Sequence, residues 1–216
     1  MVGIIYEITS NLIVKRVKYI RKIYILLSII IGIISPLICL FFAKEVDITK
    51  KPLSYFALID KTSLLWFFCL IIISFGIFWN GKEIINKYIK SRKLNLILKL
   101  VLSLSTISLI GTAIITMKFG LAHKIFALSF FLLYNFFVFL FGLFNSFSQV
   151  RQGLFSVITG SLMLLSALLI IPFPSYGIAE IVYIQICVYW NLVMFVRTNK
   201  LIRKKIINTR RKSRIS

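Results

Sequence analysis

The chain has 216 residues, of which 59% are hydrophobic and 15% charged, and its mean hydropathy is +0.95. Ordinary globular domains contain about 45–50% apolar and about 25% charged residues, so this chain has too few polar residues to cover a water-soluble fold. It is also too hydrophobic for a disordered one. The net charge of +21 does not indicate nucleic acid as a partner, because the basic residues lie in segments between long apolar runs. The composition indicates an integral membrane protein.

Six apolar runs are long enough to cross a bilayer, which takes roughly 20 helical residues for a hydrocarbon core of about 30 Å. Lipid offers the backbone no hydrogen-bond partners, so each run is expected to be an α-helix. In chain order, the predicted spans are residues 23–42, 62–80, 94–117, 124–147, 153–171 and 178–196. No connecting segment is long enough to fold alone. Residues 1–216 are therefore predicted to form one all-α domain, a bundle of six transmembrane helices.

The basic residues are divided unequally between the two sides of the predicted bundle. Residues 1–22, 81–99, 148–152 and 197–216 lie on one side and hold 21 of the 27 Lys and Arg. Cytoplasmic segments of membrane proteins carry such an excess. The sequence thus predicts a multi-pass protein of the cell membrane with its N-terminus and C-terminus in the cytoplasm.

The basic tail, residues 197–216, contains nine Lys and Arg and no acid. Each such residue near an anionic leaflet contributes about 1 kcal/mol, so the tail is expected to lie along the leaflet with a short helix through Leu201, Ile202 and Ile206. Alternatively, its charges only fix the orientation of the protein. The residues expected to contact anionic lipid headgroups are Arg203, Lys204, Lys205, Arg210, Arg211 and Lys212.

Three ionisable side chains are predicted at the same outer level of the bundle. Asp60 precedes the second span, His123 precedes the fourth, and Glu180 lies in the first turn of the sixth. Polar residues within or beside spans are the best functional pointers in a membrane protein, so the three are a candidate outward-facing pocket. A structural interpretation stands beside this one. The two acids could simply complement helix dipoles, worth about 0.3–1 kcal/mol each, with His123 in the headgroup zone.

Two polar stripes extend this hypothesis inward. Residues that share one face of the sixth span are Glu180, Tyr183, Cys187 and Asn191. Residues that share one face of the fourth span are His123, Tyr134 and Asn145. Helical periodicity places each set on one face, and if the two faces meet, they form a polar seam below the pocket. The expected ligand-binding residues are Asp60, His123, Glu180, Tyr183 and Asn191.

The supply of reactive residues limits the chemistry. A hydrolytic zinc site needs three protein ligands, commonly several histidines, and the chain has one His. No GxSxG, HExxH, P-loop or GxGxxG motif occurs. The leading interpretation is therefore non-enzymatic binding of a lipid, ion or partner helix, without metal or cofactor. One alternative is an intramembrane lipid or ester hydrolase with His123 as base beside Asp60 and Glu180. Another is an assembly subunit whose Phe-rich fourth span packs against a membrane-protein partner.

Three stretches resemble a known family. They are SYFALIDKTSLLWFFCLIIISFGIF (54–78), GTAIITMKFGLAHKIFALSFF (111–131) and GIAEIVYIQICVYWNLVMF (177–195). The layout is similar to the six-span membrane proteins grouped as domain of unknown function 998 and, more loosely, to DRAM-like membrane proteins. The resemblance implies a plasma-membrane protein without an established activity, and it carries over Asp60, His123, Glu180 and Trp190. Ile181 stands where the family pattern has a basic residue, which argues against an ion-paired Glu180.

Overall fold

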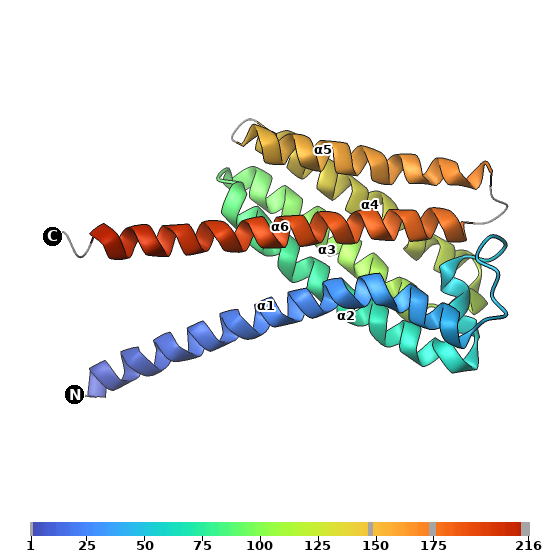
Figure 1. Ribbon diagram of the computed structural model, residues 1–216, viewed down its shortest axis with the longest axis horizontal. Helices are drawn as coiled ribbons and strands as arrows, with labels where there is room; N and C mark the ends of the chain where they lie inside the picture. Colours follow the sequence, from blue (N-terminus) through green and yellow to red (C-terminus); the bar gives the residue numbers. More distant parts are fainter. Residues whose placement is uncertain (1, 147–148, 173–175, 213–216) are drawn as a thin grey trace.

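The computed structural model describes residues 2–146, 149–172 and 176–212, with side chains described between positions 16 and 200 except at position 170. In these ranges the fold is a bundle of six long helices without strands (Figure 1). The helices are α1 (Val2–Phe42), α2 (Asp60–Tyr88), α3 (Arg92–Ile114), α4 (Leu121–Ser146), α5 (Val150–Leu165) and α6 (Gly177–Lys212). Three short 3-10 helices join them: η1 (Leu53–Leu58), η2 (Met117–Phe119) and η3 (Ser166–Ile170).

Each of the six helices contributes a stretch that is long and apolar enough to cross a membrane. These stretches are Arg16–Phe42, Asp60–Tyr88, Arg92–Ile114, Leu121–Ser146, Val150–Leu169 and Gly177–Lys200. The fold class predicted from the apolar runs, an all-α bundle of six membrane spans, is confirmed.

The first and last helices are longer than the apolar runs that predicted them. α1 begins at Val2 rather than near residue 23, and α6 continues without interruption to Lys212. Neither extension contains a glycine or proline that would end it, apart from Gly3 at the very start. At about 1.5 Å per residue, α1 is roughly 60 Å long and α6 roughly 54 Å, so both exceed a hydrocarbon core of about 30 Å.

The basic tail is accordingly the straight end of α6 (Figure 1). The helix expected through Leu201, Ile202 and Ile206 is present, as part of the long α6 rather than as a short helix; its contact with the leaflet stays a prediction. Uninterrupted helix-forming residues carry the hydrogen-bond ladder past the apolar run, because a change from apolar to basic side chains does not by itself end a helix.

The helices follow one another around the bundle. Each of α1 to α5 packs beside the next in sequence, and α6 packs across α1, α2 and α5. Figure 1 shows the long loop, residues 43–59, together with the start of α6 at one end of the bundle, called the loop end here. The two termini lie at the opposite end, the terminal end.

Glycines allow close helix contacts at two interfaces. A Cβ added to Gly76 of α2 would lie 1.8 Å from Ser28 Oγ of α1, and one added to Gly142 of α4 would lie 2.7 Å from Val157 N of α5. Small residues at such positions let membrane helices approach one another.

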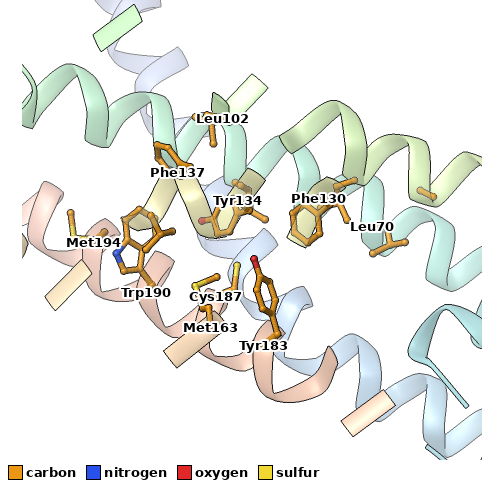
Figure 2. Packing of buried hydrophobic residues seen from close by; sticks show 14 of the residues in the cluster. Leu70, Leu102, Phe130, Tyr134, Phe137, Met163, Tyr183, Cys187, Trp190 and Met194 are labelled. Atoms are coloured by element: carbon orange, nitrogen blue, oxygen red, sulfur yellow. The ribbon is translucent and has the colours of Figure 1, made fainter. Parts of the chain in front are cut away.

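Trp190 of α6 fills the centre of the bundle (Figure 2). It is fully buried, and the centroids of Phe137 and Phe141 on α4 lie 5.9 and 6.0 Å from its own. Its indole N–H donates to Ser156 Oγ of α5 at 3.0 Å. One aromatic side chain thus joins α4, α5 and α6, and the hydrogen bond satisfies its polar atom.

Candidate functional site

Glu180 ties the first turn of α6 to the long loop. Its Oε2 accepts a hydrogen bond from the backbone N–H of Leu53 at 2.6 Å. The approach requires the glycine that opens the helix, because a Cβ at Gly177 would lie 2.3 Å from the carbonyl oxygens of both Ile48 and Lys51. The carboxylate therefore sits beneath the long loop and is held by a main-chain donor.

Among the side chains that the structure describes, no basic group forms an ion pair with this carboxylate. In the part of the chain that the structure describes, the ion pairs are Arg21–Glu83 and Lys50–Asp47. An ionised carboxylate removed from water is costly unless a cation or several hydrogen bonds compensate it. Glu180 is therefore able to interact with a ligand that brings a positive charge or a hydrogen-bond donor.

A cavity of about 160 Å³, the side cavity, lies beside Glu180 between α4, the α5–η3 segment and α6. Its walls are mostly apolar, and Glu180 is its one charged lining residue. The neighbouring polar groups are already engaged: Asn135, Ser166 and Tyr183 each donate to a backbone carbonyl at 2.7 or 2.8 Å. The side cavity thus combines an apolar surface with a single acid.

Asp60 and His123, the other two residues of the predicted pocket, have surroundings different from those of Glu180. Asp60 is exposed in the first turn of α2. His123 is buried on α4, and its Nδ1 contacts the carbonyl of Ile115 just past the end of α3. No hydrogen bond or ion pair between these three side chains occurs among the described residues, nor do any three His, Cys, Asp or Glu side chains gather into a possible metal site there.

The two polar stripes meet deeper in the bundle. Asn191 of α6 donates from Nδ2 to the hydroxyl of Tyr134 on α4 at 2.7 Å, and to the carbonyl of Cys187 at 2.9 Å. Asn80 of α2 donates to Asn191 Oδ1 at 2.9 Å. Figure 2 shows Tyr183 and Cys187 on the inner face of α6, directed toward Phe130 and Tyr134. Of the two predicted stripes, Asn191 and Tyr134 meet, and Asn80 adds a third helix to this contact. This contact is called the polar seam.

Another acid of the loop end, Asp47, lies at the exposed surface of the long loop. Asp47 accepts hydrogen bonds at Oδ1 from the Thr49 hydroxyl at 2.6 Å and the Thr49 N–H at 2.9 Å. These bonds, the hydroxyl first, lower the pKa of Asp47 below its usual range, since they stabilise the ionised form.

At the terminal end, basic side chains connect neighbouring helices. Arg21 of α1 pairs with Glu83 of α2, and the Lys87 ammonium of α2 donates to the carbonyl of Thr198 on α6. Arg21 and Lys87 thus have structural partners. The proposed headgroup contacts Arg203, Lys204, Lys205, Arg210, Arg211 and Lys212 lie outside the described side chains, although their backbone belongs to α6.

Sequence reasoning missed two partners of the site. Asn80 lies at the end of the predicted second span, and its polarity within an apolar run was a usable signal. The sequence does not indicate that the Leu53 N–H is a partner, because almost every loop residue has such a backbone donor.

No family model, curated protein or solved structure matches the chain. Its function is therefore argued from the site alone.

Proposed function

We propose that this integral membrane protein is non-enzymatic and binds an amphipathic molecule in the side cavity, with Glu180 as the polar contact. The observation that carries the proposal is the position of Glu180, an acid with no basic partner in the described part of the chain, in the wall of an apolar cavity. Ligand sites are characteristically apolar hollows with a few placed polar groups. Acids within membrane spans are costly and mark functional sites.

The chemistry of the wall selects the ligand. An apolar chain matches the side-cavity surface formed by Leu128, Phe131 and Leu132. A head that is cationic, or that donates a hydrogen bond, complements the Glu180 carboxylate. A hydrogen bond to a charged group contributes about 1.5–3 kcal/mol. The favoured class is therefore a lipid or lipid-like amine or alcohol rather than a fatty acid, whose carboxylate Glu180 would repel.

We propose an orientation for the cell membrane with both termini in the cytoplasm, on the strength of the 21 basic residues at the terminal end. The side cavity then opens in the outer half of the bilayer, and the end of α6 presents its basic residues to anionic headgroups or to the cytoplasm. A Cys introduced for Ser54 should react with an impermeant thiol reagent from outside the cell, and one introduced for Ser91 should not. The opposite pattern would overturn the orientation.

Binding can be tested with a long-chain alkylamine as probe and the purified chain in neutral-lipid nanodiscs. Glu180→Gln is the informative variant, because its amide oxygen can still accept from Leu53 N–H while the charge is lost. Loss of about 1.5–3 kcal/mol corresponds to a roughly tenfold to hundredfold weaker Kd. Asp60→Asn removes an exposed acid from the same end and should leave the Kd unchanged. Equal affinity of wild type and Glu180→Gln would refute the proposal.

A further inference from the structure

A second hollow, the central cavity, lies in the middle of the bundle where α1, α2 and α6 meet. Its volume is about 60 Å³ and its wall is mostly apolar. The polar or small residues in the wall include Ser28, Gly32, Asn80, Cys187 and Asn191. Since each water in the liquid occupies about 30 Å³, the cavity has room for about two.

One hydrogen-bond acceptor in this wall lacks a partner among the described residues, and a second lacks its usual helical donor. Asn80 is 1% exposed, and its Oδ1 has no hydrogen-bond partner among the described residues, although its Nδ2 donates to Asn191. Pro36 also lines the cavity, and because proline has no N–H, the carbonyl of Gly32 one turn earlier loses its usual helical partner. A buried acceptor left unsatisfied costs about 1–3 kcal/mol, so both favour an occupant that donates hydrogen bonds.

The occupant that fits is uncharged. The described lining of the central cavity contains no acidic side chain, and the chain carries a net charge of +21. A cation there would have no compensating charge in a medium of low polarity. Water satisfies both acceptors, fits the volume and adds no charge.

A third hollow lies between this region and the loop end. This loop cavity, about 50 Å³, is covered by Leu53 and Ser54 of η1 and has Glu180 in its wall. Five lining residues belong to both this cavity and the central cavity: Trp66, Leu70, Leu109, Phe130 and Ile184. These side chains separate the two hollows, and their rearrangement can join them.

Beyond Asn80 and Asn191, toward the terminal end, large apolar side chains pack the described core. Four that are fully buried there and line none of the three cavities are Ile84, Leu98, Leu102 and Phe137. A path that starts under the long loop therefore ends at the polar seam.

We infer that the loop-end half of the bundle holds a closed-ended water path, which enters beneath the long loop at Glu180, passes Phe130 and ends at Asn80 and Asn191. Small uncharged polar molecules can reach the middle of the bundle by this path and cannot cross. The inference does not depend on amphiphile binding in the side cavity, because it concerns the other two hollows.

The native cysteines provide a matched test. Cys187 lines the central cavity, whereas Cys39 and Cys69 are buried and line none of the three cavities. Three single-cysteine chains, with the other cysteines replaced by Ala, would be treated in liposomes with the small neutral reagent methyl methanethiosulfonate. Only a thiolate reacts, and a thiolate forms only where water reaches the sulfur. Cys187 should be modified at least about tenfold faster than Cys39 or Cys69. Equal rates would overturn the inference.

The route is tested by filling the loop cavity. Ala127 of α4 lines it. Ala127→Leu adds three carbon atoms that must pack in the loop cavity and fill part of it. In the single-Cys187 chain, this substitution should slow the modification of Cys187 at least about threefold. Ala122→Leu, on the exposed surface of the same helix, should have no effect. An unchanged rate in Ala127→Leu would refute the route.

Water beside Asn80 and Asn191 can also be detected in the wild-type chain, without any substitution. Solid-state NMR in lipid should show magnetisation transfer from water to the side-chain amide protons of Asn80 and Asn191. Absence of that transfer, with transfer present to the half-buried Asn95 at the start of α3, would overturn the inference.

Discussion

Two glutamates at opposite ends of the bundle have opposite environments. Glu83 of α2 lies at the terminal end and is paired with Arg21 of α1; the side chains are 13% and 36% exposed. Glu180 of α6 lies at the loop end, accepts a hydrogen bond from a backbone N–H, and lines apolar cavities. The first acid joins two helices, while the second has capacity left for a ligand.

The difference follows from how charge is distributed. The terminal end holds 21 of the 27 basic residues, so an acid there readily finds a cation. The loop end holds six, and those of the long loop stand at the surface, as Lys50 does in its pair with Asp47. The asymmetry that orients a membrane protein thus also decides which of its acids stays unpaired.

The largest effect is expected where Glu180 is positioned. Gly177→Ala places a Cβ 2.3 Å from the carbonyl oxygens of Ile48 and Lys51. Backbone atoms cannot swing aside as a flexible side chain can, so we expect a loss of about 3 kcal/mol, at the upper end of overpacking costs. Unfolding in mixed micelles measures it. Gly120→Ala is unsuitable as a control because Gly120 has a φ of 52°. Ser63→Ala should change little, because the half-buried Ser63 bonds only within the first turn of α2.

The second prediction distinguishes the hydrogen bond that Glu180 accepts from Leu53 N–H from the charge of Glu180. Glu180→Ala leaves the Leu53 N–H without its acceptor, and a bond to a charged group contributes about 1.5–3 kcal/mol. Hydrogen exchange at the Leu53 amide should therefore accelerate by roughly ten- to hundredfold. Glu180→Gln should largely restore protection, because the amide oxygen is still an acceptor. Fast exchange in both variants would show that the charge, rather than the bond, holds the loop.

The ion pair at the terminal end should contribute less. A double-mutant cycle with Arg21→Ala and Glu83→Ala is expected to give a coupling of about 0.2–1 kcal/mol, since Arg21 is more than a third exposed and water screens the pair. Thermal unfolding at low and high salt measures the coupling and its screening. A coupling well above 1 kcal/mol would mean that Glu83 is as shielded as Glu180, and the contrast between the ends would fail.

Sequence reasoning located much of this arrangement for identifiable reasons. Apolar runs of about 20 residues have few structural solutions in a membrane, so the six spans were predictable. Periodicity also placed Tyr134 and Asn191 on inward faces, because a helix fixes which residues share a side, and these two side chains are in contact.

The remaining features depend on the relative positions of helices and loops. Periodicity cannot tell that Asn80 of α2 reaches Asn191, or that the long loop brings the Leu53 N–H to Glu180. The convergence of Asp60, His123 and Glu180 was a guess from their common level, and no bond joins them among the described residues. The depth of a residue in the membrane does not determine how its helix is rotated about its own axis. That rotation decides which side chains meet.

A third acid, Asp47 in the long loop, has an exposed side chain and gives the smallest expected effect. Thr49 donates two hydrogen bonds to its carboxylate and lowers its pKa below the usual 3.8. A lowered pKa means that the turn is stabilised at any pH above 3.8 and loses that contribution as the pH falls through the lowered value. Thr49→Val removes the hydroxyl but keeps the N–H, so the Asp47 pKa should rise part of the way back. A ¹³C carboxyl titration measures the change, with Asp60 in the same spectrum as an internal reference. If the Asp47 pKa stays unchanged in Thr49→Val, the hydroxyl is not its cause, and Lys50 is the next group to replace.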